Sequence, residues 1–255
     1  MTRAKSVGFF RVASPAIGIV CVLALIGAAA AAAGPRQEKV QFAKGTSSAV
    51  IKGHLKGDAD VDYVVRAAAG QTLSVTLKET NPQNYFNVLP PGSKGGAMFV
   101  GDTGEDYTGM LPTDGDYIVR VYLMRPAARR GESSDYTLTI GVTGEPLAPL
   151  PAAKDALVPG TSYHATAKIK CVPAYETSTQ DCDASVIRRG HDGTATVDIA
   201  GAAENRSILF VKGKPVASNA SRMDVLSSER KGDVTVVRLG DSERYEVPDA
   251  LLTGG

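Results

Sequence analysis

Three arginines, Arg125, Arg129 and Arg130, lie within the ten-residue segment Met124–Ser133. An arginine side chain is long, keeps its positive charge in water and forms paired hydrogen bonds with a carboxylate. The segment joins two stretches of alternating apolar residues and is longer than an ordinary hairpin loop of about two to five residues. We interpret the three arginines as a partner-binding loop that reaches into an acidic cleft on another molecule.

The same residues have a simpler interpretation, because surface arginines are common and a solvated loop tip needs no partner. Arg120 differs from the loop arginines, since it lies inside an alternating stretch next to Tyr122. We expect Arg120 to support a sheet or to pair with an acidic side chain. The sequence pattern alone leaves both interpretations of the loop open.

The elements on either side of the loop have the period of two that is typical of β-strands. Turns rich in glycine, proline and aspartate separate them, and no convincing long helix is present. This spacing predicts an all-β fold, with an antiparallel β-sandwich or barrel in the first half of the chain. The alternating stretches there are Val61–Val65, Thr72–Lys78, Tyr117–Leu123 and Asp135–Val142.

The amino terminus has the pattern of a secretory signal peptide. Arg3, Lys5 and Arg11 precede an apolar run, Ala16–Ala33, that ends in small residues. A positive segment, an apolar segment and a small-residue cleavage site predict a signal peptide over residues 1–33. The alternative is an uncleaved anchor, although an alanine-rich run inserts weakly. We therefore expect a periplasmic or secreted protein with no stable membrane span after leader cleavage.

Removal of the leader changes the charge balance. The full chain has 28 basic and 27 acidic residues, and the leader holds three of the basic ones. The remaining chain has a net charge of −2, so it lacks the basic excess that holds a phosphate backbone. We expect no nucleic-acid partner.

Two cysteines, Cys171 and Cys182, remain beyond the leader. An even pair in an exported protein predicts a disulfide bond. The closed loop is short, so the bond should contribute about 3 kcal/mol. Zinc is a poorer interpretation, because two thiolates without a nearby histidine pair leave a tetrahedral site incomplete.

A proline-rich segment divides the chain into two predicted domains. Residues 143–159 contain four prolines, which exclude a helix or a central strand and favour a semi-stiff linker. We predict a β-sandwich over 38–142 and a small β-rich domain over 160–255, stapled by the disulfide. The strand candidates of the second domain are Tyr163–Cys171, Ser185–Arg188, Ala195–Ile199, Ser207–Val211, Val234–Leu239 and Arg244–Val247.

Catalytic patterns are missing from the sequence. The three histidines, His54, His164 and His191, fall in different segments, and we expect solvated positions for them. No nucleophile elbow, zinc-protease motif or phosphate loop occurs. The run Asp58, Asp60 and Asp62 does not fit the spacing of an EF-hand, which leaves only a looser calcium site open. We expect no catalytic residue, no metal and no cofactor, and hence no enzyme.

Several segments resemble known exported bacterial proteins. Asp58–Tyr63, Ala69–Leu73 and Leu111–Val121 resemble the pre-peptidase C-terminal type of β-sandwich. Tyr117–Val121 followed by Arg125–Arg130 resembles the periplasmic inhibitors of goose-type lysozyme. Phe42–Ala49 is similar to their opening strand and turn, and Gly131 departs from their pattern by replacing a polar side chain. Cys182–Gly190 and Glu243–Ala250 are similar to an exported bacterial module of unknown function.

The resemblance to lysozyme inhibitors implies a function for the arginine loop. It implies that Arg125 and Arg129 enter the active-site cleft of the enzyme, with Arg130 as a flanking charge. The most specific hypothesis is therefore inhibition of a goose-type, peptidoglycan-cleaving lysozyme as the protein partner. The alternative is a non-inhibitory module that binds peptidoglycan or another envelope component, whether glycan or protein.

Overall fold

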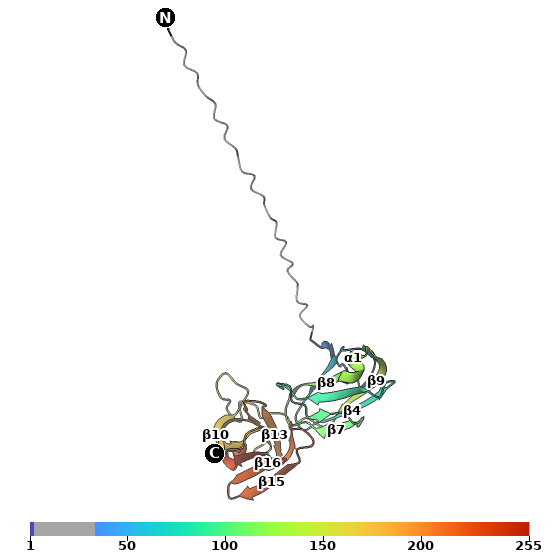
Figure 1. Ribbon diagram of the computed structural model, residues 1–255. Coiled ribbons are helices and arrows are strands. Elements are labelled where there is room, and N and C mark those ends of the chain that lie inside the picture. The colour runs from blue at the N-terminus through green and yellow to red at the C-terminus, as the bar shows by residue number, and fades with distance from the viewer. Residues whose placement is uncertain (3–33, 255) are drawn as a thin grey trace. The chain divides into compact units, whose positions relative to one another are not determined.

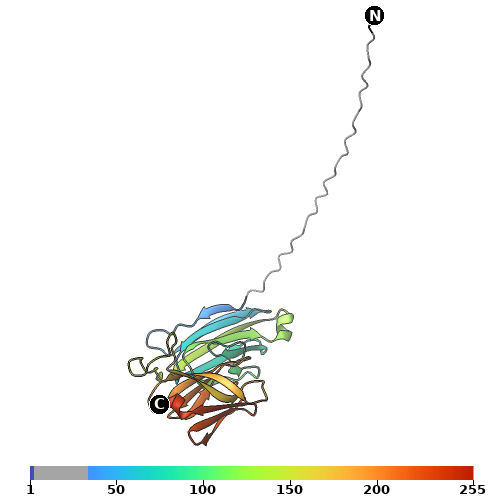
Figure 2. The same cartoon turned by 90° about the vertical axis from the view of Figure 1, so that its left-hand side faces the viewer.

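The structure is a computed structural model that describes residues 1–2 and 34–254 of the 255-residue chain. The chain from Pro35 onward forms one compact unit. The predicted signal peptide, apart from its first two residues, lies outside the described residues. Strands β1–β9 and strands β10–β17 form separate sheets, coloured blue to yellow-green and yellow to red in Figures 1 and 2.

The first nine strands form the two sheets of a β-sandwich. The five-stranded sheet has the order β1-β3-β8-β5-β6, and the four-stranded sheet has the order β2-β9-β4-β7. Only the pair β1–β3 is parallel among their described pairings. The strands are β1 (Arg36–Lys39), β2 (Ser48–Lys56), β3 (Val61–Ala67), β4 (Thr72–Glu79), β5 (Asn84–Leu89), β6 (Phe99–Val100), β7 (Tyr107–Met110), β8 (Gly115–Leu123) and β9 (Ser133–Thr143).

Alternation along the central strands builds the core of the sandwich. In β8, Tyr117, Val119 and Val121 are fully buried, while the residues between them are partly exposed. Because side chains of a strand point alternately to the two faces of a sheet, each sheet buries one face against the other. The hydroxyls of Tyr63 and Tyr136 meet at 2.8 Å across this core, so both buried phenols are hydrogen-bonded.

The remaining strands form one eight-stranded sheet that curls almost into a barrel. Its order is β14-β13-β12-β11-β10-β17-β16-β15, and the edge strands β14 and β15 approach each other. The predicted disulfide is confirmed, since Cys171 bonds Cys182 and ties β10 to β11. The strands are β10 (Ala165–Val172), β11 (Gln180–Arg188), β12 (Ala195–Ile199), β13 (Arg206–Val211), β14 (Lys214–Ser218), β15 (Leu226–Lys231), β16 (Val234–Leu239) and β17 (Glu243–Pro248).

The all-β prediction is confirmed, and each predicted strand is present within a few residues. The sequence did not identify β1, β2, β5, β6, β7, β14 or β15. β15 is exposed along most of its length, so no apolar alternation marks it. Two short helices also went unpredicted, α1 (Arg125–Arg129) and α2 (Asp249–Thr253), because five residues are too few to show a helical period.

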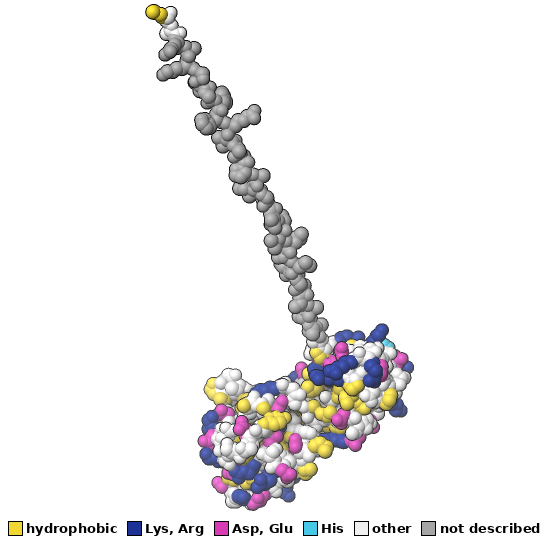
Figure 3. Space-filling model, viewed as in Figure 1, with side chains coloured by type: hydrophobic (Ala, Val, Ile, Leu, Met, Phe, Trp, Pro, Cys, Tyr) yellow, Lys and Arg dark blue, Asp and Glu magenta, His cyan; other side chains and the backbone are white. Residues whose placement is uncertain are grey.

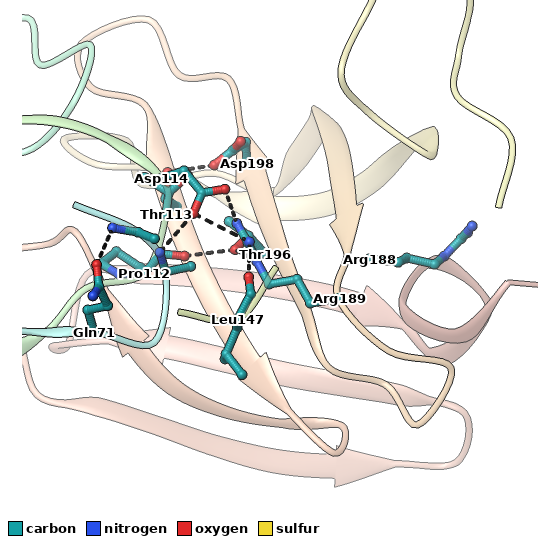
Figure 4. Close-up of polar contacts among 12 residues, drawn as sticks. Gln71, Pro112, Thr113, Asp114, Leu147, Arg188, Arg189, Thr196 and Asp198 are labelled. Carbon is teal, nitrogen blue, oxygen red and sulfur yellow. Dashed lines mark hydrogen bonds and ion pairs between the residues drawn. The ribbon is translucent and has the colours of Figure 1, made fainter. Parts of the chain in front are cut away.

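A buried arginine joins the sandwich to the barrel-like sheet. Arg189 follows β11, and its guanidinium donates to both carboxylate oxygens of Asp114, at 2.9 and 3.4 Å. It also donates to the Leu147 carbonyl oxygen and, at 3.0 Å, to the Thr196 hydroxyl. Thr196 in turn donates to the Pro112 carbonyl oxygen at 2.8 Å. Figure 4 shows Arg189 directed at this network, whereas Arg188 points the other way.

The segment between the two groups of strands contacts both of them. The Leu147 amide donates to the Ala69 carbonyl oxygen, and the Leu150 amide donates to the Arg188 carbonyl oxygen. The Leu147 side chain packs with Ala69 and Leu209 in a small apolar cluster. The domain boundaries and the linker at 143–159 stay predictions, but these contacts hold the segment on both sides.

Candidate functional site

The predicted arginine loop contains the helix α1, which lies between β8 and β9 (Figure 1). Pro126 in its first turn fits a helix start, where the missing amide hydrogen costs nothing. The helix ends because Gly131 has a φ of +67°, a left-handed conformation that glycine adopts without strain. The amides of Gly131 and Glu132 donate to the carbonyl oxygens of Ala128 and Ala127, at 2.9 and 3.2 Å. This is a Schellman motif, and it explains glycine at the position where the resemblance departs from the inhibitor pattern.

Two alanines anchor α1 to the sandwich. Ala127 and Ala128 are buried in the main apolar core. Beyond the helix, the backbone carbonyl oxygen of Glu132 accepts a hydrogen bond from the Gly57 amide at 2.8 Å. The Glu132 carboxylate accepts a hydrogen bond from the Asn81 side-chain amide at 2.9 Å. The short helix is therefore held from below by packing and at its end by hydrogen bonds.

Arg125 and Arg129 lie on the outer side of α1, and both are exposed. They are four residues apart, so they lie on the same face of the helix, about 5–6 Å apart at Cβ. Within residues 34–254, neither guanidinium has a hydrogen bond or ion pair to another group. In Figure 3, Lys and Arg side chains gather over α1, at the upper right of the view.

Arg130 has a different environment. Its guanidinium donates to the Glu132 carboxylate at 2.6 Å, and the pair is partly exposed. The hydrogen bond from Asn81 lowers the pKa of Glu132, and the bond from Arg130 adds to this effect. Arg130 thus stabilises the end of α1, while the other two arginines keep their hydrogen-bonding groups free.

Arg120 pairs with an acid, as the sequence analysis predicts. Its guanidinium makes two hydrogen bonds to the nearly buried carboxylate of Asp62, at 2.7 and 2.9 Å. The two residues face each other on the neighbouring strands β3 and β8. Arg120 therefore stabilises the five-stranded sheet and is not part of the exposed arginine pair.

The histidines correct one expectation. His54 lies within β2 at an exposed position, as expected, and its Nδ1 contacts the Asp135 carboxylate at 2.8 Å. His164 is buried, not solvated: its Nδ1 accepts the Arg188 amide and its Nε2 donates to the Leu150 carbonyl oxygen. Residues 34–254 contain no group of three or more His, Cys, Asp or Glu side chains that could hold a metal ion.

The residues that hold the site and the interface leave no local pattern in the sequence. Asn81 and Gly57 are distant in sequence from α1, so only pairing across the sheets reveals them. Arg189 directly follows Arg188 at the end of a predicted strand, and this pair of basic residues does not indicate which of the two is buried. The Asp114 carboxylate accepts the Ala69 amide at 2.9 Å in addition to the Arg189 guanidinium.

A comparison with solved structures finds similarity to periplasmic lysozyme inhibitors over less than half of the chain. PliG of Aeromonas hydrophila, a periplasmic inhibitor of g-type lysozyme, is 35% identical, with 42% of this chain and 96% of that chain covered, at a TM-score of 0.39. A mutant of the Escherichia coli PliG is 27% identical, with 43% and 99% covered and a TM-score of 0.35. PliG of Salmonella Typhimurium is 26% identical, with 42% and 98% covered and a TM-score of 0.34.

Other comparisons add no family. No family model and no curated protein sequence matches the chain. More than half of the present chain also has no counterpart in the three similar structures. Neither α1 nor α2, the helices within residues 34–254, has the length and apolar character needed to cross a bilayer.

Proposed function

We propose that this chain is an exported, non-enzymatic inhibitor of a g-type lysozyme, and that α1 makes the inhibitory contact. The observation that carries the proposal is the pair Arg125 and Arg129, two exposed guanidiniums without partners among the described residues, on a helix anchored by buried alanines. The similar solved structures are periplasmic inhibitors of this enzyme class, which supports the choice of partner.

The spacing of the two arginines suits a glycosidase cleft. Glycosidases cleave with two carboxyl groups about 5–10 Å apart in a groove. Two guanidiniums one helical turn apart have a comparable spacing and can each pair with a carboxylate. Pairing in a groove from which water is excluded contributes a few kcal/mol, reduced by the cost of removing both charges from water.

The anchoring of α1 lowers the cost of binding. A loop that must become ordered on binding loses conformational entropy, whereas a preorganised one does not. Here the Schellman motif and the Gly57 and Asn81 hydrogen bonds fix the helix before any partner arrives. Only the two arginine side chains have to be immobilised.

The direct test is inhibition of cell-wall clearing. The chain from Gly34 onward is mixed at micromolar concentration with goose-type lysozyme and a suspension of bacterial cell walls. We expect slower clearing, and Arg125→Ala with Arg129→Ala should remove most of the inhibition without changing the melting temperature. Normal clearing with the unmodified chain would rule the proposal out.

A charge-matched control separates a specific contact from general electrostatic attraction. Lys44 and Arg66 are exposed cations at the end of the sandwich opposite to α1. Lys44 precedes β2, whose first residue pairs with Gly141 near the far end of β9. Arg66 pairs with Asp116 at the start of β8, whereas α1 follows the end of that strand. Lys44→Ala with Arg66→Ala removes the same charge and should leave inhibition unchanged.

Sedimentation with purified peptidoglycan tests the alternative of an envelope-binding module. This alternative gains support if the unmodified chain and the Arg125→Ala, Arg129→Ala variant sediment with peptidoglycan to the same extent.

A further inference from the structure

A polar cavity of about 400 Å³ lies between the sandwich and the barrel-like sheet. Its walls come from the turn at Thr113 and Asp114 on one side and from β11, β12 and β13 on the other. It is at the end of β8 opposite to α1, about 27 Å away along the strand. The volume is in the usual range for small-molecule sites.

Adjacent strands place a row of polar side chains along this cavity. Ser185 on β11 pairs in register with Asp198 on β12, which pairs with Ser207 on β13. All three side chains lie on the face of the sheet away from its apolar core, and all three line the cavity. The row is therefore a consequence of register and brings together residues from separate parts of the sequence.

Asp198 is at the centre of the row. Its two carboxylate oxygens accept the Ser207 hydroxyl at 2.6 Å and the Tyr163 hydroxyl at 3.2 Å. A carboxylate offers about four acceptor positions, so each oxygen keeps one free. Burial raises the pKa of Asp198, because no cation pairs directly with it to offset the lost hydration.

Two further hydroxyls at the cavity have no partner. Thr113 is buried and Ser185 is half-buried, and neither hydroxyl makes a hydrogen bond to another group within residues 34–254. Both hydroxyls are therefore open to the cavity and available to a molecule bound there. Each can both donate and accept, unlike the carboxylate, which only accepts.

The charges around the cavity argue against an anion and against a metal ion. The two arginines nearest to it are neutralised, Arg189 by Asp114 and Arg206 by Glu243, so no free cation is available for an anion. The acidic side chains at the cavity do not gather closely enough to hold a metal ion. A neutral ligand rich in hydroxyl groups fits best, because neighbouring hydroxyls can donate to both oxygens of Asp198.

We propose that this cavity binds a neutral sugar unit, with the Asp198 carboxylate and the Tyr163 hydroxyl oxygen accepting hydrogen bonds from its hydroxyls and Thr113 and Ser185 completing the contacts. The site is independent of the arginine pair, since it lies at the other end of the sandwich. It gives the chain a second binding function, which does not require that α1 inhibits any enzyme.

The test uses glucose and N-acetylglucosamine as neutral probes, glucosamine as a cationic one, and the chain from Gly34 onward. We expect shifts of amide resonances around the cavity with a dissociation constant on the order of 1 mM for a neutral monosaccharide. Tyr163→Phe and Asp198→Asn should each weaken binding about tenfold or more. Tyr122→Phe removes a similar hydroxyl-to-side-chain hydrogen bond within the sandwich and should leave binding unchanged.

Three results would overturn the proposal. The first is no shift with any probe at a concentration about ten times the expected dissociation constant. The second is that both cavity variants bind the neutral probes as tightly as the unmodified chain does. The third is binding of glucosamine alone, which would indicate recognition of a cation. Should Asp198→Asn lower the melting temperature strongly, Tyr163→Phe decides, because it keeps the ring in place. Both variants should still slow lysozyme if α1 inhibits it, so failure of one proposal does not imply failure of the other.

Discussion

The arginines of α1 and the arginine at the interface have the same side chain in opposite surroundings. The Arg189 side chain is 0% exposed and its guanidinium bonds a carboxylate, a carbonyl and a hydroxyl. Arg125 and Arg129 are exposed and have no such bonds among the described residues. A buried charge must be fully paired, whereas an exposed charge in water need not be. Arg189 therefore connects the two groups of strands, whereas the α1 pair has no internal contact among the described residues.

The largest expected effect is at Arg189. Arg189→Leu leaves Asp114 without its cation and should lower the free energy of unfolding by about 3 kcal/mol, measured by urea denaturation. Adding Asp114→Asn should recover part of the loss, because the unpaired charge is then gone. A loss below about 0.5 kcal/mol would show that the interface does not depend on this pair.

Arg120 provides an intermediate case, because its side chain is 33% exposed and its partner Asp62 is 3% exposed. Arg120→Gln should lower the free energy of unfolding by about 1.5–3 kcal/mol, the range for hydrogen bonds to a charged group. Arg66→Gln is the matched control on the same two strands, since its pair with Asp116 is exposed and should contribute little. Equal losses for both variants would contradict the link between burial and effect.

The end of α1 tests whether the exposed pair depends on a fixed helix. Gly131→Ala places a side chain at a φ of +67°, which should cost about 1–2 kcal/mol, although no atom lies close enough to clash. Asparagine tolerates this conformation better, so Gly131→Asn should lose less. Thermal unfolding of the three chains measures the difference, and identical melting temperatures would argue against the Schellman motif.

Asp198 adds a smaller, pH-dependent effect at the same interface as Arg189. Its folded-state pKa is raised from 3.8, so the folded chain binds this proton more tightly than the unfolded chain. Its contribution to stability is therefore complete below about pH 4 and decreases as pH rises through the raised pKa. The asparagine in Asp198→Asn does not titrate. The stability of this variant relative to the unmodified chain should therefore increase from acidic to neutral pH. Parallel stability curves from pH 3.5 to pH 8 would contradict this.

The smallest expected effect on stability is at α1 itself. Arg125→Ala with Arg129→Ala should change the free energy of unfolding by no more than about 0.5 kcal/mol, as for other exposed side chains. The same variant should lose most of the proposed inhibition. A clear drop in stability, seen in urea denaturation, would mean that these arginines have structural partners after all.

How much of the site the sequence could predict differs from residue to residue. The strands β8 and β9 and the arginines between them were predictable, because alternation is a local signal. The helix α1 was not, since its five residues are held by Ala127 and Ala128 packing on the core. His164 was expected in solvent, yet contacts to Leu150 and Arg188 enclose it. Burial of a polar residue depends on distant segments, which a local pattern does not reveal.

Residue types and their spacing were enough to predict the all-β fold, the disulfide between Cys171 and Cys182 and a concentration of positive charge between two strands. These follow from the period of side chains along a strand and from residue type. Folding determines which arginines are paired within residues 34–254, and it places Ser185, Asp198 and Ser207 in one row. The physical reason is that pairing and burial are set by strand register and sheet packing, which bring together residues far apart in the chain.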